Sequence, residues 1–202
     1  MSLFGIIGGT FDPVHYGHLV LAEKAREAFN LEKVVFVPAA IPPHKIGAVT
    51  TAAIHRLNMV KLAITNNPYF EVSRIELDRV GPSYSIDTVK ELKRQGYGEE
   101  AAFIMGFDSL LELNTWKNYQ EFLAETKVLT AFRPGFPILK NEADWPRFLR
   151  PFLDRILIFE APLLDISSTW LRVELMYNRS IKYLVPDSVS NYIDENRLYR
   201  SY

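Results

Sequence analysis

Two hundred and two residues, 48% of them hydrophobic and 23% charged, have the composition of a globular protein and exclude a disordered or fibrous chain. The 23 lysine and arginine residues nearly balance the 24 aspartate and glutamate residues, so the formal net charge is −1 and a surface built to coat nucleic acid is excluded. The chain contains no cysteine, which excludes disulfide bonds, thiolate nucleophiles and cysteine zinc sites.

The amino-terminal residues do not resemble a targeting segment. The first apolar run is short, and no basic residue precedes it, unlike the start of a signal peptide. No apolar stretch approaches the roughly 20 residues that cross a bilayer. We therefore expect a cytoplasmic protein without a membrane partner.

Short apolar runs alternate along the chain with longer segments of helical periodicity. The expected strands are continuous apolar runs, typical of sheets covered by helices on both faces, at 3–7, 34–37, 101–105, 128–132 and 156–159. A further strand candidate, 70–73, has polar flanks. The expected helices between them are 19–29, 54–65, 86–95 and 119–125. Strand and helix in turn predict parallel βαβ units with right-handed crossovers.

Proline and glycine gather in three segments, 38–43, 81–82 and 133–137, and each segment follows an expected strand. Loops at the carboxyl ends of strands are where open α/β sheets bind their ligands. After Phe159 the pattern changes to two helices, 168–176 and 188–196. We therefore predict a single domain over residues 1–202. It consists of a doubly wound parallel α/β core at 1–160 and a small helical carboxyl-terminal part at 161–202.

The loop between the first expected strand and the first expected helix is the most informative part of the sequence. Gly8 and Gly9 let the backbone turn and approach a ligand without interference from a Cβ atom. A helix that begins near His15 or Gly17 would aim its unpaired N–H groups and its positive dipole end at this loop. His15 and His18 are three residues apart, so in a first helical turn they project to the same side. Gly17 lowers helix propensity, which makes sense if a bulky ligand lies against the backbone there.

Surface histidines on an ordinary loop are the alternative for His15 and His18. These two of the chain's four histidines lie beside three glycines at a helix start, which favours a bound ligand. No Gly-Lys-Ser/Thr follows, as a P-loop requires, and the glycine spacing does not match the dinucleotide-binding G-x-G-x-x-G pattern. The loop therefore indicates a ligand site of another kind.

A serine-rich segment near the carboxyl terminus predicts a second anion site. Serine and threonine are favoured N-cap residues, so a helix is expected to begin at Ser168 or Thr169. Arg172 then lies one turn inside the helix, and hydroxyls, free N–H groups and a guanidinium together suit a polyphosphate. The alternative is a simply capped helix with a surface arginine. Trp170 is interpreted as a packing residue.

Three further loops bear on a second substrate. Prolines stiffen the segment that presents His44 and Lys45, which suits a phosphate, although a solvated loop tip is the alternative. The segment 82–88 opens a helix whose free amides could meet a carboxylate or a phosphate. Asp108 and Trp116 follow the fourth expected strand, 101–105. They are open to the alternatives of a helix cap and a core aromatic. His55 has no evident partner and is interpreted as a structural or surface residue.

These segments together resemble a known enzyme family. Residues 9–18 read G-T-F-D-P-x-H-x-G-H and residues 166–172 read I-S-S-T-x-x-R, similar to the two signatures of the H-x-G-H nucleotidyltransferase superfamily. The P-P-H-K loop, the P-S-Y-S-I-D-T segment, the G-F-D turn, Trp116 and the tail S-I-K-Y-L-V-P resemble bacterial nicotinate mononucleotide adenylyltransferases. The resemblance covers roughly residues 3–199 and leaves 136–152 as a variable insertion. Phosphopantetheine adenylyltransferases, which lack two of these loops, are a minor alternative.

The resemblance implies a role for each matching residue. It implies that His15, His18 and Arg172 are catalytic. It implies that ATP is bound by the two signatures and the G-F-D turn, through Gly8, Gly9, Thr10, Phe11, His15, His18, Gly106, Asp108, Ile166, Ser167, Ser168 and Arg172. It implies that the mononucleotide is bound by Thr10, His44, Lys45, Ser85, Thr88, Trp116, Lys117 and Arg133.

The implied reaction joins ATP and nicotinate mononucleotide and releases pyrophosphate. The attacking phosphate is already largely dianionic at pH 7, since its second pKa is about 6, so catalysis reduces to alignment and charge compensation. Mg²⁺ is expected to enter with ATP and to keep most of its waters, so no residue is assigned as a metal ligand. Two alternatives remain, the same chemistry on nicotinamide mononucleotide and a non-catalytic nucleotide-binding protein. The expected partners are these small molecules, with no nucleic acid and possible self-association into a homo-oligomer.

Overall fold

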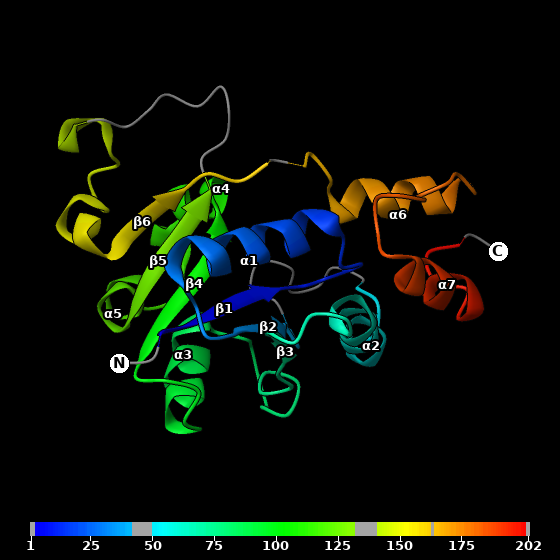
Figure 1. Cartoon of the computed structure of the whole chain (residues 1–202), viewed down its shortest axis with the longest axis horizontal. Coiled ribbons are helices and arrows are strands. Elements are labelled where there is room, and N and C mark those ends of the chain that lie inside the picture. Colours follow the sequence, from blue (N-terminus) through cyan, green and yellow to red (C-terminus); the bar gives the residue numbers. More distant parts are fainter. Residues whose placement is uncertain (1–2, 42–49, 132–140, 163, 201–202) are drawn as a thin grey trace. The chain divides into compact units, whose positions relative to one another are not determined.

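The computed structural model describes residues 3–41, 50–131, 141–162 and 164–200, and strands and helices alternate through most of them (Figure 1). The strands are β1 (Leu3–Gly9), β2 (Val34–Pro38), β3 (Phe70–Val72), β4 (Glu100–Gly106), β5 (Thr126–Ala131) and β6 (Ile156–Phe159). The α-helices are α1 (Tyr16–Phe29), α2 (Ala53–Ile64), α3 (Ser85–Arg94), α4 (Phe107–Leu111), α5 (Tyr119–Glu125), α6 (Ser168–Met176) and α7 (Asp187–Glu195). Short 3₁₀ helices are η2 (Leu113–Thr115), η3 (Glu142–Asp144) and η4 (Arg150–Arg155).

The six strands follow the order β3-β2-β1-β4-β5-β6, which is that of a doubly wound α/β sheet. β1 pairs in parallel with β4, β4 with β5, and β5 with β6. In this register Ile6 lies opposite Phe103, and both side chains are buried. The predicted fold class, a parallel α/β sheet with helices at the carboxyl end of the chain, is confirmed.

The observed bounds of three elements agree with the expected ones, and those of two others differ. The bounds of β6, α5 and α6 are those expected from the pattern. α1 begins three residues before the expected start, because the histidine loop itself enters the first helical turn. The strand candidate with polar flanks forms β3, which has only three residues.

The chain divides into two compact units that interleave along the sequence. The first unit comprises residues 1–8, 21–34 and 84–163, and the second comprises 9–20, 35–83 and 164–202. The second unit therefore contains both signature segments, 9–18 and 166–172. The expected division of the chain at residue 160 stays a prediction about domain organisation.

In the first unit, aromatic rings and buried strands form the core. The ring of Phe103 in β4 lies 5.2 Å from that of Phe122 in α5, centroid to centroid, in an edge-to-face arrangement. Trp145, in the segment after η3, is buried with its ring 6.4 Å from that of Phe107. This core fixes the position of α5 against the sheet.

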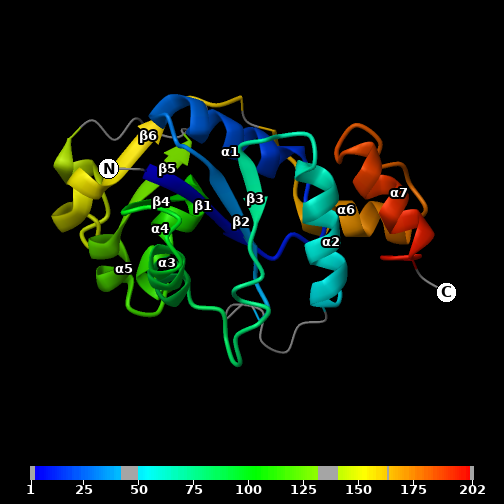
Figure 2. The ribbon, with the colours of Figure 1, turned by 60° about the horizontal axis from the view of Figure 1, so that its bottom comes forward.

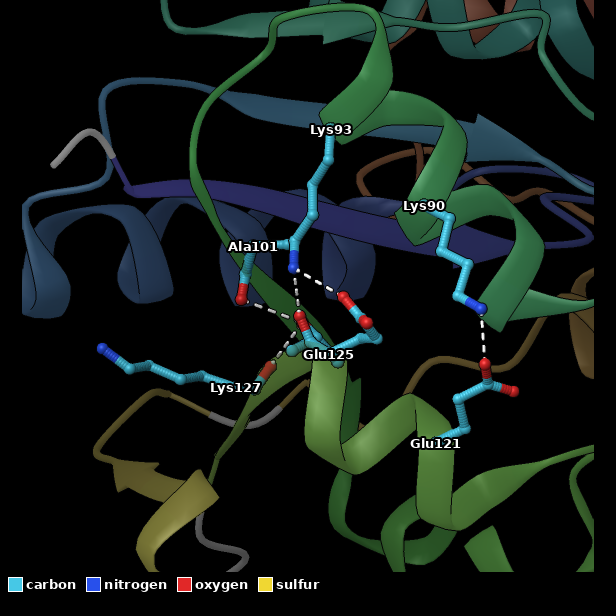
Figure 3. Close-up of polar contacts among 7 residues, drawn as sticks. Lys90, Lys93, Ala101, Glu121, Glu125 and Lys127 are labelled. Carbon is cyan, nitrogen blue, oxygen red and sulfur yellow. Dashed lines mark hydrogen bonds and ion pairs between the residues drawn. The ribbon is translucent and has the colours of Figure 1, made fainter.

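Two lysines of α3 reach acidic residues of α5 (Figure 3). Nζ of Lys93 donates to the main-chain oxygen of Glu125 at 2.6 Å and to its carboxylate at 3.0 Å. Lys90 forms an ion pair with Glu121. Such partly exposed pairs contribute roughly 0–1 kcal/mol each to the free energy of unfolding. Their main effect is therefore to join α3 to α5.

The second unit is built on the rings of Phe11, Phe36 and Phe70. The Phe36 centroid lies 5.8 Å from that of Phe11 and 5.1 Å from that of Phe70. In the same unit α2 lies beside α7, as Figure 2 shows. The hydroxyl of Tyr192 in α7 contacts Nδ1 of His55 in α2 at 2.9 Å. His55 therefore joins two helices, which confirms its structural interpretation.

Of the helices that the structure describes, none combines the length and the apolar character that a membrane span requires.

Candidate active site

The loop that follows β1 places two imidazoles at the start of α1. The rings of His15 and His18 lie with centroids 3.7 Å apart and planes 32° apart, which confirms that they project to the same side. Phe11, at a φ of 51°, packs its buried ring edge-to-face against His18 at 5.0 Å. The Phe11 ring thus packs against the His18 imidazole, which in turn lies on the His15 imidazole.

The hydrogen bonds of His18 define which of its ring nitrogens carries the proton. The main-chain N–H of His15 donates to Nδ1 of His18 at 3.2 Å. Because a backbone N–H can only donate, Nδ1 must be unprotonated, and the neutral ring carries its proton on Nε2. His18 therefore presents an N–H donor at the edge of the ring opposite to the backbone.

Burial keeps both imidazoles neutral in the free protein. Desolvation lowers the pKa of His15 from 6.5 to about 4. Desolvation, followed by repulsion from His15, places the pKa of His18 well below its usual value. Among the described residues, Nδ1 of His15 is buried without a hydrogen-bond partner, which is costly unless a ligand supplies one.

Gly17 is explained by its neighbour. A Cβ atom at this position would lie 3.0 Å from Nδ1 and 3.1 Å from Cε1 of His15. The His15 ring therefore explains the need for glycine here, and the ligand expected against the backbone of Gly17 stays a prediction. The same holds at Gly9, where a Cβ would lie 3.2 Å from the ring of Phe11.

The serine-rich segment forms the predicted helix start. α6 begins at Ser168, and the hydroxyl of Ser167 caps it by accepting from the main-chain N–H of Trp170 at 3.1 Å. Ile166 precedes this cap. The side chain of Trp170 is 46% exposed, so its interpretation as a packing residue is wrong.

The two signature segments meet in the second unit. Oγ of Ser168 donates to the main-chain oxygen of Pro13 at 2.9 Å. Nη1 of Arg172 donates to the main-chain oxygen of Asp12 at 2.7 Å, and its Nη2 donates to Oγ1 of Thr169 at 3.3 Å. Residues more than 150 positions apart thus share one cluster of donors, in which the Arg172 guanidinium supplies the positive charge.

Beneath this loop lies a buried polar network to which the sequence pattern assigns no role. Asp12 is 2% exposed. Its Oδ1 accepts from the hydroxyl of Tyr199 at 2.6 Å, and its Oδ2 accepts from the main-chain N–H of Thr51 at 3.2 Å. The carboxylate is thereby satisfied on both oxygens, from two different parts of the chain.

Arg56 completes the network from α2. Its guanidinium donates to three main-chain oxygens, those of Thr10 at 2.8 Å, Thr51 at 2.9 Å and Ala40 at 3.3 Å. Burial lowers its pKa, and the nearby Asp12 carboxylate acts in the opposite direction. Arginine stays charged in proteins, so Arg56 is a fixed cation under the loop. The sequence signal for it was a single charged residue on the apolar face of a helix.

The remaining predicted residues that the structure describes lie in the first unit. α3 begins at Ser85, and Nζ of Lys117 lies 4.1 Å from the ring centroid of Tyr84, the residue before Ser85. Thr88 is buried, and its Oγ1 donates to the main-chain oxygen of Tyr84 at 3.3 Å. Its side chain therefore supports the helix start, and its expected role in binding the mononucleotide stays a prediction.

Trp116 is partly buried against two aromatic rings and partly exposed. Its ring lies 5.9 Å from that of Phe103 and 5.6 Å from that of Phe122, while the side chain stays half-buried. Gly106 is the N-cap of α4, and the exposed Asp108 lies in its first turn. The alternative of Asp108 as a helix cap stays open, because the N-cap residue itself is a glycine without a side chain.

Three predicted residues, His44, Lys45 and Arg133, lie outside the described residues. The variable segment 136–152 is described from residue 141, where the Asn141 and Asp144 side chains form a capping box around η3. Gly8 lies at the end of β1, where an added Cβ would meet the Phe103 ring at 3.0 Å.

Known proteins are similar to this chain in sequence and in fold. A family model described as cytidylyltransferase-like matches residues 6–174. A protein of Moorella thermoacetica named as a probable nicotinate-nucleotide adenylyltransferase is 49% identical over 198 residues, 97% of this chain and 91% of that protein. A protein of Desulfitobacterium hafniense with the same name is 45% identical over 196 residues, 97% of this chain and 95% of that protein.

A solved structure agrees in fold over nearly its whole length. The nicotinic acid mononucleotide adenylyltransferase of Plasmodium falciparum, complexed with NaAD, has a TM-score of 0.79 at 22% identity, with 98% of each chain covered. At this identity the likeness shows the fold, and the curated relatives show the family. The chain belongs to the nicotinate-nucleotide adenylyltransferase family of cytidylyltransferase-like proteins.

Proposed function

We propose that this chain transfers the AMP group of ATP to nicotinate mononucleotide, giving nicotinate adenine dinucleotide and pyrophosphate in NAD biosynthesis. The observation that carries the proposal is the joining of the two signature segments. Arg172 is bonded to Asp12 and Ser168 to Pro13, beside the paired imidazoles of His15 and His18. Relatives that are 41–49% identical carry the name of this activity, which supports it further.

The chemistry needs alignment more than activation. A phosphate oxygen of the mononucleotide attacks the α-phosphorus of ATP in line, and the bond from that phosphorus to the α,β-bridging oxygen breaks. The attacking group has a second pKa of about 6 and needs no base. The negative charge that leaves with pyrophosphate must be met by fixed donors, as in other phosphoryl-type transfers.

The residues of the second unit provide those donors. Thr10, His15 and His18 face the α- and β-phosphates, with the Nε2–H of His18 as a directed donor. A triphosphate raises the pKa of a neighbouring imidazole, so His15 gains positive charge as the ligand arrives, whereas His18, whose Nδ1 accepts from the main chain, stays a neutral donor. Arg172 supplies a charge that is always present, and Ser168 lies at the α6 start, which offers free main-chain N–H groups.

The other predicted contacts complete the two substrate sites. We assign the binding of the adenosine part of ATP to Gly106 and Asp108. The remaining residues that we assign to the ATP site, where the backbone passes the ligand, are Gly8, Gly9, Phe11, Ile166 and Ser167. We assign the mononucleotide to Thr10, Ser85, Trp116 and Lys117, with Thr88 as support, and its phosphate to His44, Lys45 and Arg133. Amide donors at a helix start match a carboxylate on both oxygens, whereas a carboxamide turns an NH₂ toward them, which favours the nicotinate form.

Mg²⁺ is the metal we propose, bound with ATP. The donors around the loop are imidazoles, a guanidinium and hydroxyls, which suit phosphate oxygens and not a hard cation that prefers carboxylates and water. Within the described ranges, no three histidine or acidic side chains are grouped as a metal site. A metal carried by the phosphates fits this donor set. It would neutralise phosphate charge when bound, while His15, His18 and Arg172 hold the oxygens.

One assay separates the proposal from its alternatives. Pyrophosphate release is measured with ATP and nicotinate mononucleotide, and again with nicotinamide mononucleotide. The proposal expects a higher kcat/KM with nicotinate mononucleotide. A preference for nicotinamide mononucleotide would favour the first alternative, and ATP binding without pyrophosphate release would favour a non-catalytic protein. A cytoplasmic location and self-association stay predictions.

A further inference from the structure

We infer that Tyr199, four residues beyond the end of α7, is a positioning residue for the triphosphate site. Its hydroxyl holds the side chain of Asp12, and the main chain of Asp12 holds Arg172. The inference rests on the proposed function, since it assigns to Tyr199 the orientation of a residue that binds ATP. No contact between Tyr199 and the ligand is required.

Asp12 is the residue through which the effect passes. Its carboxylate accepts from Tyr199 at 2.6 Å and from Thr51 at 3.2 Å, and its carbonyl accepts from Arg172 at 2.7 Å. Side chain and carbonyl belong to one residue that is 2% exposed, so neither end can move independently. The guanidinium of Arg172 therefore takes its position from a carbonyl that Tyr199 helps to fix.

The chemistry of this contact makes it strong. The hydrogen bond from a hydroxyl to a buried carboxylate is charge-assisted and is worth more than a neutral one. Burial raises the pKa of Tyr199, and the Asp12 carboxylate raises it further, so the hydroxyl stays protonated and able to donate over the working pH range. Arg56 holds the carbonyl of Thr10 at 2.8 Å and Ser168 holds that of Pro13 at 2.9 Å, so the loop is fixed on both sides of Asp12.

Removal of the hydroxyl would leave Oδ1 of Asp12 buried without this donor. The carboxylate would then turn toward another donor, and the carbonyl would turn with it. Small displacements of a phosphate-binding group have large effects on rate, because the group must meet the oxygen at a hydrogen-bonding distance. The expected defect is therefore in ATP binding and turnover, beyond any loss of stability.

The chain offers a matched control in Tyr192. This tyrosine also lies in the carboxyl-terminal part, and its hydroxyl contacts His55 at 2.9 Å and Asn58 at 3.0 Å. Removal of the Tyr192 hydroxyl breaks hydrogen bonds between α7 and α2, as removal of the Tyr199 hydroxyl breaks the one to Asp12, but it leaves the contacts of Asp12 unchanged. Tyr199→Phe and Tyr192→Phe thus remove the same atom from two partly buried contacts of the same unit.

The experiment measures ATP binding separately from catalysis. Titration calorimetry with a non-hydrolysable ATP analogue is run on the unchanged chain and on both variants, together with melting temperatures. We expect Tyr199→Phe to weaken binding about tenfold and Tyr192→Phe to leave it unchanged, although both lower the melting temperature. Steady-state kinetics should show that Tyr199→Phe raises the KM for ATP and lowers kcat, with the KM for the mononucleotide unchanged.

A double-mutant cycle tests the route through Arg172. If Tyr199 acts by positioning the guanidinium, Tyr199→Phe adds little to the binding loss caused by Arg172→Ala. Fully additive losses, equal losses in the two tyrosine variants, or unchanged ATP binding in Tyr199→Phe would each overturn the inference. If the unchanged chain binds the analogue but makes no dinucleotide, the proposed function fails while the comparison of variants can still be read.

Discussion

The ring of His15 covers Gly17, and the ring of His18 lies on His15 with centroids 3.7 Å apart. The two imidazoles form one stacked unit at the start of α1. They are neutral in the free protein because burial lowers both pKa values. A pair of neutral imidazole donors suits the oxygens of a phosphate ligand.

His18→Ala tests the directed donor. Removal of a preorganised donor to developing charge lowers kcat by roughly 10²–10³, and we expect a loss in this range. Steady-state pyrophosphate release measures it, with His55→Ala as the matched control, since His55 contacts only Tyr192 among the contacts described above. A loss of less than about threefold in kcat would remove His18 from this role.

Gly17→Ala tests the packing of His15. The added methyl favours the helix by roughly 1 kcal/mol but would lie 3.0 Å from the imidazole, so it must displace the ring. We expect an unchanged or slightly raised melting temperature together with a clear fall in kcat. In a His15→Ala background the same substitution should cause no further fall, because the ring is gone. A fall of equal size in both backgrounds would show that Gly17 matters for another reason.

The lowered pKa of His15 predicts how stability depends on pH. The unfolded chain binds protons on this imidazole near pH 6.5 and the folded chain only near pH 4, so stability is fully present above pH 6.5 and is lost as the pH falls toward 4. For His15 alone the loss between pH 8 and pH 5 is about 2 kcal/mol, and His18 acts in the same direction. Urea unfolding at the two pH values measures it. An equally large loss in His15→Gln would contradict this assignment.

Trp116→Ala tests the mononucleotide site. We expect a higher KM for the mononucleotide and a nearly unchanged KM for ATP. Because Trp116 also contacts Phe103 and Phe122, the variant should lose stability as well. Trp116→Phe keeps an aromatic face and is the control for packing. An equal rise in both KM values would indicate a folding defect instead of a lost contact.

The fold and the conformation of the loop at residues 9–18 could be predicted because each depends on local sequence. Apolar runs and glycines define β1 and the turn after it, and the spacing of His15 and His18 defines their common side. The serine N-cap predicted the start of α6 correctly. The joining of α6 to the loop was expected only through the resemblance, since no local pattern connects Arg172 with Asp12.

The buried network could not be predicted for the same physical reason. The contact of Tyr199 with Asp12 joins residues 187 positions apart, and neither residue has a pattern that marks the other. The packing of the His15 ring against Gly17 has no signal in the sequence either. Thr88 matches a motif, yet its side chain is bonded within α3. A motif identifies residues, whereas packing decides which of their atoms face outward.

The most direct measurement of the central claim is the binding of inorganic triphosphate to the unchanged chain, to His18→Ala and to Arg172→Ala, by titration calorimetry at pH 7. This ligand has no base or sugar, so it reports only on the donors that both signature segments would place around the phosphates. The account predicts that each substitution alone weakens triphosphate binding substantially. Unchanged affinity in either variant would show that the two segments do not hold the same ligand and would contradict the account.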